Sequence, residues 1–535
     1  MKISAIILLL YFSGTLYANA QCPPTTAFDY LDINNVKARI NNGGDMWWDL
    51  ESSVEYIVPK TGNISATFAG ALWIGGIEAQ GQLHVAAQAY RQSGNDYFAG
   101  PLDETGNVTT QTCSDFDRIW KINKSTIDSF IAGLFVTPPA SIAQWPGRGN
   151  PNLPFLPNQR VAPFIDVDGD WLYNSSEGDY PAIPGDQALW FVFNDAGGIH
   201  SESGGLPLGV EVQCLAYAVK DSTTCTYSTT FYHYNIINKS MNDYDSVFVG
   251  FWNDADLGCM YDDYFGSDSL NHLMVVYNKD SIDGPGSICF DNYPDNPPTF
   301  AIQILKGPTD KTGAVRYLDH AMVTYKEAGM GYPVDALDFY EYMQSIWRDG
   351  THLTYGGNGY GESIITNFIY PDDPSLEDGW SECAENNAGS DFRLVLSSGP
   401  FAIASGEEQT FDFAVLWEKD DVYPCPSFEN ITALATCNRN YFDSSIVFTS
   451  VENHSVPDYP ANVFPNPISL NDELTFTLNN VSLLELYDLA GRKLKAFDVR
   501  NQRSIRIKTN FGTGIFFYRL TLKDHAYHTG KFVVE

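Results

Sequence analysis

The sequence predicts a mainly β protein, in which a β-sandwich-type body with a few short helices precedes a small C-terminal β-sandwich. Two observations carry this prediction. Apolar side chains recur at every second position in many short runs, which is the pattern of half-buried strands. The 535 residues also include 44 Gly and 29 Pro, which supply the turns that such strands need. With 31 Tyr, 33 Phe and 11 Trp, the chain can fill sizeable cores.

Residues 1–20 have the features of a signal peptide. Lys2 precedes an apolar run from Ile6 to Phe12, and Ala18-Asn19-Ala20 has the small-x-small form of a signal peptidase site. The apolar run is too short to cross a bilayer, and no later segment has the length and apolarity of a membrane helix. Cys22 could suggest a lipoprotein, but Gln21 stands directly before it, where a lipoprotein has a small residue. We therefore expect cleavage after Ala20 and export.

The N-terminal β-rich region is expected at residues 21–205. The apolar runs within residues 72–87 predict a hairpin that turns at Gly81. One helix is expected at Thr126–Leu134, with Ser125 as its N-cap.

A second, β-sandwich region is expected at residues 206–450. Three long strands are predicted there, at Val210–Val219, Thr229–Asn238 and Ser246–Trp252. Apolar residues at helical spacing predict an amphipathic helix over Val334–Trp347. Residues 398–417 are expected to form a closing hairpin. The Pro-containing segment 451–460 is the predicted linker to the C-terminal unit.

The charge of the chain is divided unevenly between these parts. The formal net charge is −35, and residues 461–535 hold 10 basic and 7 acidic residues, or +3, which leaves −38 for residues 1–460. Such an acidic body should repel nucleic acid and anionic lipid, which excludes both as partners. The charge suits cation binding or solubility.

The nine cysteines are an odd number, so at least one thiol stays unpaired. Disulfides are expected in an exported chain, and the absence of a CxxC pair argues against a zinc or thioredoxin-type site. From their spacing we expect Cys425 to pair with Cys437 across a short helical segment. Cys214 and Cys225 are the second expected pair, across a hairpin.

Four motifs follow one another near the C-terminus: Phe464-Pro465-Asn466-Pro467, Leu486 to Arg492, Gly512 to Leu520, and His528 to Glu535. Their order and spacing resemble the type A C-terminal sorting domain of type IX secretion cargo, which is found in the Bacteroidota. The resemblance implies an Ig-like β-sandwich over residues 461–535 that the type IX secretion machinery recognises. It also implies delivery to the outer cell surface or the medium, with cleavage expected between about Ser450 and Val463.

The body resembles large secreted Bacteroidota proteins that carry the same tail. Three segments carry this resemblance: Asn41 to Trp48, Phe68 to Gly76, and Tyr90 to Asp96. That group has no assigned activity, so the resemblance implies a class of protein and no mechanism.

The best candidate for chemistry is an acidic loop at residues 166–177. Its oxygen-bearing residues match the ligand spacing of a calcium loop at positions 1, 3, 5, 9 and 12: Asp166, Asp168, Asp170, Asn174 and Glu177. Asp179 and Asp186 could add ligands. The loop departs from an EF-hand because Trp171 stands at position 6, where Gly is required, and no flanking helices are evident. A solvated Asp-Gly turn is the alternative.

Asp254 and Asp256 form a second candidate calcium set, and Asp262, Asp263 and Asp268 follow them in the sequence. They come directly after a predicted strand, so we expect them at a tip of the sandwich, where such folds often hold ligands. A polar loop that keeps an acidic protein soluble is the competing interpretation.

Enzyme signatures are mostly absent. The chain has neither HExxH nor GxSxG, and His200-Ser201-Glu202-Ser203 places base and nucleophile types together without making a triad. Four tryptophans could stack on sugars if exposed, although core packing is their commoner fate: Trp47, Trp48, Trp73 and Trp380. We therefore expect a non-enzymatic binding, adhesion or structural protein with an unknown extracellular ligand. The alternative is a secreted hydrolase of polysaccharide or protein with an unrecognised catalytic site.

Overall fold

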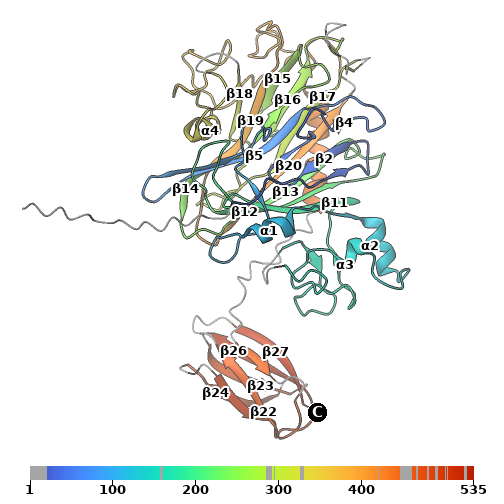
Figure 1. Ribbon diagram of the computed structural model, residues 1–535, viewed down its shortest axis with the longest axis vertical. Coiled ribbons are helices and arrows are strands. Elements are labelled where there is room, and N and C mark those ends of the chain that lie inside the picture. The colour runs from blue at the N-terminus through green and yellow to red at the C-terminus, as the bar shows by residue number, and fades with distance from the viewer. Residues whose placement is uncertain are drawn as a thin grey trace, which may run out of the picture. The chain divides into compact units, whose positions relative to one another are not determined.

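The structure is a computed structural model in which the chain forms two compact units, Met1–Val447, called the body, and Phe448–Glu535 (Figure 1). The residues it describes are 21–156, 161–284, 289, 292–293, 296–325, 330–419, 421–445, 461–464, 468–478, 481–488, 492–500, 502, 504–522 and 527–534. The expected signal peptide and linker lie outside these residues. Within them, no helix is long and apolar enough to span a membrane.

The described part of the body contains two large antiparallel sheets. The first has the order β1-β2-β3-β5-β14-β19-β18, with β4 paired to β2 and β6 paired to β5. Its strands are β1 (Phe28–Leu31), β2 (Lys37–Asn41), β3 (Asp45–Met46), β4 (Tyr56–Ile57), β5 (Ala69–Glu78), β6 (Leu83–Ala87), β14 (Tyr244–Asp254), β18 (His320–Thr324) and β19 (Arg393–Ile403). The hairpin expected at Gly81 is present as β5 and β6.

The second large sheet has the order β15-β16-β17-β20-β13-β12-β11-β7, with β8 paired to β11. Its strands are β7 (Phe98–Ala99), β8 (Trp120–Asn123), β11 (Gln187–Asn194), β12 (Val210–Ala218), β13 (Thr229–Asn238), β15 (Asp263–Asp268), β16 (Leu273–Asn278), β17 (Thr299–Lys306) and β20 (Glu408–Glu418). A separate pair is formed by β9 (Phe164–Ile165) and β10 (Tyr180–Pro181).

The two large sheets pack face to face around one apolar core. Phe251 of β14 contacts Phe413 of β20, with their ring centroids 4.5 Å apart. The Trp47 indole nitrogen donates a hydrogen bond to the Tyr232 hydroxyl at 3.0 Å, so this buried polar pair also joins the layers. The body is therefore a β-sandwich, as the sequence predicted.

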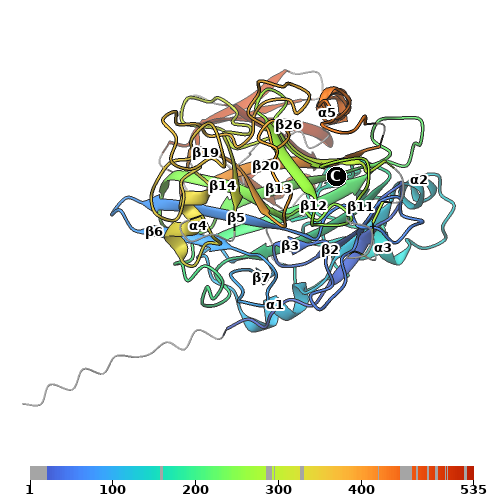
Figure 2. The same cartoon turned by 90° about the horizontal axis from the view of Figure 1, so that it is seen from above.

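Helices lie on the outside of the sandwich (Figure 2). They are α1 (Thr110–Phe116), α2 (Lys124–Ile131), α3 (Ala140–Ala143), α4 (Ala336–Tyr342) and α5 (Glu429–Ser445). Phe339 of α4 packs on Trp73 of the first sheet, with centroids 4.7 Å apart. Tyr441 of α5 lies on Phe231 of the second sheet at 5.5 Å.

Two helix predictions need correction. Ser125 is not an N-cap, because α2 begins one residue earlier at Lys124, directly after β8. The Asn123 side chain at the cap position instead accepts a hydrogen bond from Gln187 at 2.9 Å. The helix expected at Val334–Trp347 is shorter, since α4 ends at Tyr342.

The closing hairpin expected at residues 398–417 is also wrong. β19 belongs to the first sheet and β20 to the second, so the turn between them carries the chain from one layer to the other. The regions 21–205 and 206–450 share both sheets, because β5 pairs with β14 and β11 pairs with β12.

Both predicted disulfides are wrong. The four bonds of the structure are Cys22–Cys113, Cys225–Cys437, Cys259–Cys289 and Cys383–Cys425, and the buried Cys214 is free. Cys437 lies in α5 and Cys425 before it, so about eight helical residues, roughly 12 Å of rise, separate them. Cys214 pairs in register with Tyr234, which places Cys225 beyond the strand end.

The C-terminal unit is a smaller sandwich, as predicted. Its three-stranded sheet is β21 (Ala461–Phe464), β22 (Glu473–Leu478) and β25 (Ser504–Lys508). Its four-stranded sheet is β24 (Lys493–Asp498), β23 (Val481–Tyr487), β26 (Gly514–Leu522) and β27 (Tyr527–Val534). Phe476 of β22 contacts Tyr518 of β26 at 5.3 Å and so links the sheets.

Candidate metal-binding loops

The first candidate loop, residues 166–179, is closed by the short ladder between β9 and β10. Tyr180 pairs with Ile165 in this ladder, which holds the two ends of the loop together. A chain of alternating carboxylates is therefore folded back on itself, and side chains far apart in an extended strand come close.

Backbone amides inside the loop bind its carboxylates. Asp166 accepts hydrogen bonds from the amides of Gly169 at 2.7 Å and Trp171 at 2.8 Å. Asp179 accepts from the amides of Val167 and Asn174, both at 2.8 Å. These bonds give the loop a defined turn around its acidic groups.

Trp171 occupies the position where an EF-hand loop requires glycine. Its φ is 67°, and Gly169 has a φ of 80°. The backbone thus adopts the left-handed conformation of a sharp turn in spite of the tryptophan side chain. The departure that the sequence suggested at this position does not prevent the turn.

Two groups of carboxylates meet in the loop. Asp166, Asp168 and Asp179 place ligand atoms within 4.8 Å of one another, and so do Asp168, Asp170 and Glu177. Asp168 belongs to both groups. These acidic groups could hold a metal ion, and oxygen-only ligands favour a hard cation.

The remaining residues of this prediction differ in outcome. The Asn174 side-chain amide donates to Glu177 at 2.7 Å, so it contacts one of the predicted ligands. Asp179, which is 1% exposed, joins the site, whereas Asp186 accepts from the Lys220 amide at 2.8 Å.

The charges of the first loop repel one another. Loss of hydration, together with the like charges of Asp170, Asp179 and Glu177, raises the pKa of Asp168. A bound cation would remove this repulsion and favour the ionised carboxylates.

The second predicted set lies at the end of β14. Asp254 and Asp256 meet Asp391, which the sequence reasoning missed, with ligand atoms within 4.8 Å. The Arg393 guanidinium lies 2.8 Å from Asp254, and the Tyr90 hydroxyl donates to Asp254 at 2.5 Å. A cationic side chain therefore already balances this cluster.

Asp268 lies elsewhere, in a hollow of about 320 Å³ beside the start of α5. Asp373 in the same hollow accepts from the Phe428 amide at 2.8 Å and from Ser375. Although burial opposes it, these hydrogen bonds hold the pKa of Asp373 below its ordinary value. This carboxylate therefore holds the segment before α5 and is poorly suited to act as a general acid.

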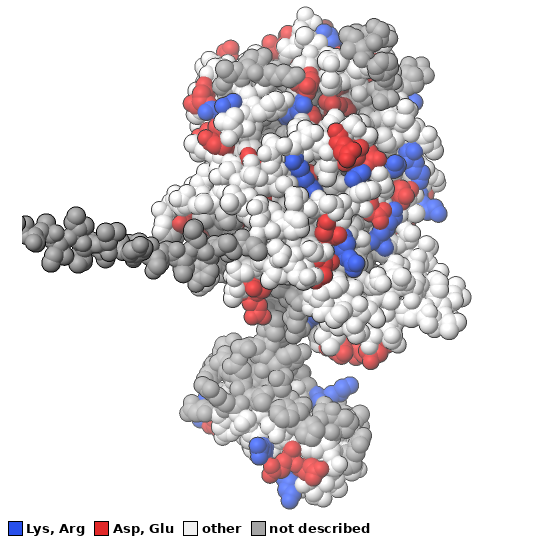
Figure 3. Space-filling view, viewed as in Figure 1, with Lys and Arg blue, Asp and Glu red and all other residues white. Residues whose placement is uncertain are grey.

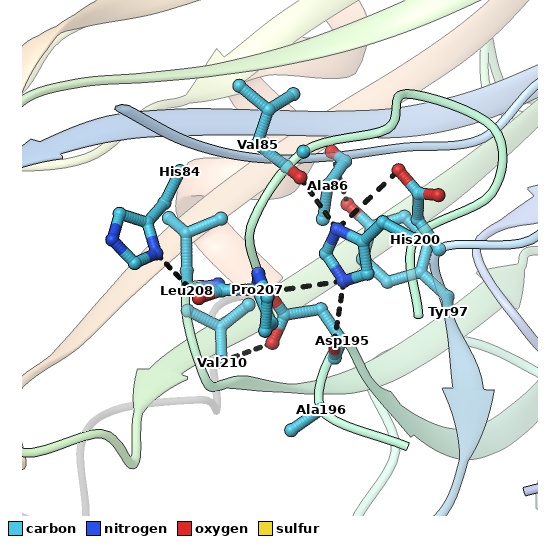
Figure 4. Close-up of polar contacts among 12 residues, drawn as sticks. His84, Val85, Ala86, Tyr97, Asp195, Ala196, His200, Pro207, Leu208 and Val210 are labelled. Carbon is cyan, nitrogen blue, oxygen red and sulfur yellow. Dashed lines mark hydrogen bonds and ion pairs between the residues drawn. The ribbon is translucent and has the colours of Figure 1, made fainter. Parts of the chain in front are cut away.

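His200 is buried and makes no triad (Figure 4). Its Nδ1 lies 2.7 Å from the Val85 carbonyl oxygen and its Nε2 lies 2.6 Å from that of Asp195. Both partners can only accept, so both ring nitrogens donate and the ring is a cation. The carboxylates of Asp96 and Asp195 lie 3.7 and 3.9 Å away and balance it.

Comparison with known proteins assigns the C-terminal unit. Residues 462–535 match the family model of the secretion system C-terminal sorting domain. The chain is therefore a type IX secretion cargo protein, and it is exported to the cell surface or the extracellular space. The sorting domain implies interaction with the type IX secretion machinery.

Two further comparisons cover curated proteins and solved structures. No curated protein matches the chain. A solved polysaccharide lyase aligns with 7% sequence identity and a TM-score of 0.18, over 61% of this chain and 34% of the lyase. The chain thus spans about a third of that protein, and the likeness carries no argument about activity.

Proposed function

We propose that the body is a calcium-stabilised, non-enzymatic protein of the cell surface or medium that serves in binding, adhesion or structure. The observation that carries this proposal is the loop at residues 166–179, where two carboxylate groups share Asp168. Export favours the proposal, because extracellular modules use calcium sites with Kd values of about 10⁻⁴–10⁻³ M. In this proposal Asp166, Asp168, Asp170, Asn174 and Glu177 hold the ion, and Asp179 adds a further ligand.

Asp254 and Asp256 remain a secondary calcium candidate in this proposal. An ion there would compete with the Arg393 guanidinium, which lies 2.8 Å from Asp254. We therefore expect the loop at residues 166–179 to dominate any calcium response.

Two findings favour binding or structure over hydrolysis. The tryptophans that could have stacked on sugars, Trp47, Trp48, Trp73 and Trp380, are at most 2% exposed. Among the described residues, His200 and Asp373 already use their polar atoms in structural hydrogen bonds.

A calcium titration of the mature chain tests the proposal. A cation that binds only the native state stabilises it by about 2.7 kcal/mol at a hundredfold excess over Kd. We expect a chelator to lower the melting temperature of the body, and Asp168→Ala to abolish most of that response.

Asp310→Ala is the matched control. Asp310 also accepts backbone hydrogen bonds in an exposed turn, from Thr312 at 2.8 Å and Ala314 at 3.1 Å, and no carboxylate group includes it. This variant should keep the full calcium response. Identical melting curves of the wild-type protein with calcium and with chelator would refute the proposal and leave a solvated turn.

A further inference from the structure

The outer face of the four-stranded sheet in the sorting domain carries a row of large side chains. In strands β23, β26 and β27, every second residue belongs to the core of the domain, which directs the alternate residues outwards. These core residues are Leu484, Leu486, Phe516, Tyr518, Leu520, Phe532 and Val534. The outward residues include Tyr487, Phe517 and Lys531.

These outward residues form one row across the sheet. Tyr487 pairs in register with Phe517, and Phe517 pairs with Lys531. On its other side, Tyr487 pairs with Lys493 across a bulge. Directly opposed residues have Cβ atoms about 4.5–5.5 Å apart. The row therefore places two aromatic rings side by side, with a lysine at each end.

Phe517 is the most informative member of the row. It is 40% exposed, and it alone is exposed among the sorting-domain aromatics whose burial the structure describes. Tyr487 beside it is half-buried, whereas Lys493 and Lys531 are exposed. A single exposed apolar side chain is ordinary on a protein surface. A pair of aromatic rings with a polar border is instead typical of the centre of a protein interface.

A buried carboxylate holds two cations of this face in place. Glu485 is 3% exposed, and its Oε1 atom lies 2.5 Å from the Lys493 ammonium nitrogen. The Nε atom of Arg519 donates to Oε2 of Glu485 at 2.8 Å, and the guanidinium lies 5.7 Å from the centroid of the Tyr487 ring. Because these contacts fix the long side chains in advance, less conformational entropy is lost when a partner binds.

The face carries more positive than negative charge. Lys493, Arg519 and Lys531 stand against the one carboxylate of Glu485, which leaves a formal charge of +2. Complementary charges speed the encounter of two proteins and fix their orientation. The arrangement therefore suits an acidic partner.

The outer face of the three-stranded sheet differs. The outward residues of β22 and β25 whose burial is described are Glu473, Thr475, Ser504, Arg506 and Lys508. None of these side chains is aromatic, and Arg506 lies 3.9 Å from Glu473. The part of this face that β22 and β25 form thus lacks an aromatic centre.

We propose that the outer face of the four-stranded sheet is the surface by which the sorting domain docks on an acidic protein surface of the type IX secretion machinery. This docking face is defined by Glu485, Tyr487, Lys493, Phe517, Arg519 and Lys531. Because the matched family implies contact with that machinery, a protein is favoured over a lipid surface as the partner. The two rings fill the centre of the contact, and the cations meet carboxylates of the partner around them.

Secretion of the internally tagged full-length chain by the bacterium that produces it tests the docking face. We expect Phe517→Thr and Lys531→Glu each to reduce the amount at the cell surface several-fold and to accumulate in the periplasm. Cell fractionation and immunoblotting measure both pools. Lys531→Arg keeps the charge and should be secreted like the wild-type chain.

Arg506→Glu is the matched control. It reverses the charge of a cation whose side chain is 73% exposed, on the outer face of the other sheet. Like Lys531 on β27, Arg506 lies on a strand at the end of its sheet order. This variant should be secreted normally.

The outcomes decide between the docking face and its alternatives. Hydrogen exchange on each purified chain verifies that the sorting domain is folded, and the exposed Lys531 can be reversed without a change in the core. Normal secretion of folded Phe517→Thr and Lys531→Glu would overturn the inference. An equal loss in Arg506→Glu would also overturn it, because the total charge of the domain would then be what is recognised. Binding of the wild-type chain, but not of Lys531→Glu, to phosphatidylglycerol vesicles would assign the face to a lipid surface and not to a protein.

Discussion

Residues 1–460 carry a formal net charge of −38, whereas the sorting domain, residues 461–535, carries +3. In the sorting domain, the 3% exposed Glu485 lies 2.5 Å from Lys493 and also pairs with Arg519. In the body, Asp168, Asp263 and Asp283 have no such partner between described residues and have raised pKa values. The sorting domain thus balances Glu485 with cations of its own, whereas these three carboxylates of the body have no cationic partner among the described residues.

The two units also differ in covalent bracing. All nine cysteines precede the sorting domain, and the four disulfides lie in the body. On the face shown in Figure 3, charged side chains form small separate groups on a largely uncharged surface. The disulfide bracing that the structure shows is therefore confined to the body.

The largest effect is expected from removing the sorting domain. A chain that lacks Val463–Glu535 should stay in the periplasm, because the matched family model covers residues 462–535. Cell fractionation and immunoblotting measure this directly. Normal appearance of the truncated chain at the surface would contradict the sorting role, and the full-length chain with an internal tag is the control.

The next largest effect is expected at His200, the buried cation of the body. His200→Gln leaves the carboxylates of Asp96 and Asp195 without their positive partner, which costs about 3–5 kcal/mol. We expect a markedly lower melting temperature in calorimetry. His352→Gln, at an exposed position, is the control and should melt like the wild-type protein. Equal stability of both variants would show that His200 is a neutral core residue.

Opposite pH responses should distinguish the two units. Burial raises the pKa of Glu382 in the body from 4.5 to about 8. Because the folded state favours the protonated form of Glu382, this group contributes stability at pH values below its pKa in the unfolded chain. That stability is lost as pH rises through about 8. Glu382→Gln should therefore stabilise the body by a few kcal/mol at pH 9 and little at pH 4. Melting curves at both pH values test this, and an equal gain at both would contradict it.

The pKa shift of Glu485 in the sorting domain has the opposite sign to that of Glu382. Although burial opposes it, hydrogen bonds from Lys493 and Arg519 hold the pKa of Glu485 below its ordinary value of 4.5. The stability that ionised Glu485 contributes to the sorting domain is present at neutral pH and is lost as pH falls through the lowered pKa. Glu485→Gln should thus destabilise the sorting domain at neutral pH, as hydrogen exchange can measure.

Local patterns in the sequence were sufficient to predict several strands and one acidic loop. Period-two runs located β12 and β13. Carboxylate spacing likewise placed Asp168 close to Asp166 in one group and close to Asp170 in the other, because neighbours in sequence decide both features.

Partners distant in sequence were not predictable. Arg393 reaches Asp254, and Cys437 reaches Cys225, only because the sheets place β14 beside β19 and α5 beside β20. The pairing of Asp263 with Asn278 likewise depends on a hairpin register that composition does not fix.

Cys214 lies on β12, between register partners Phe191 and Tyr234, and is completely buried. Burial also raises the pKa of its thiol, so the reactive thiolate is suppressed in the folded chain. An alkylating reagent can reach this sulfur only when the middle of the second sheet opens. The rate at which Cys214 is alkylated therefore reports how often the second sheet opens, without an introduced label.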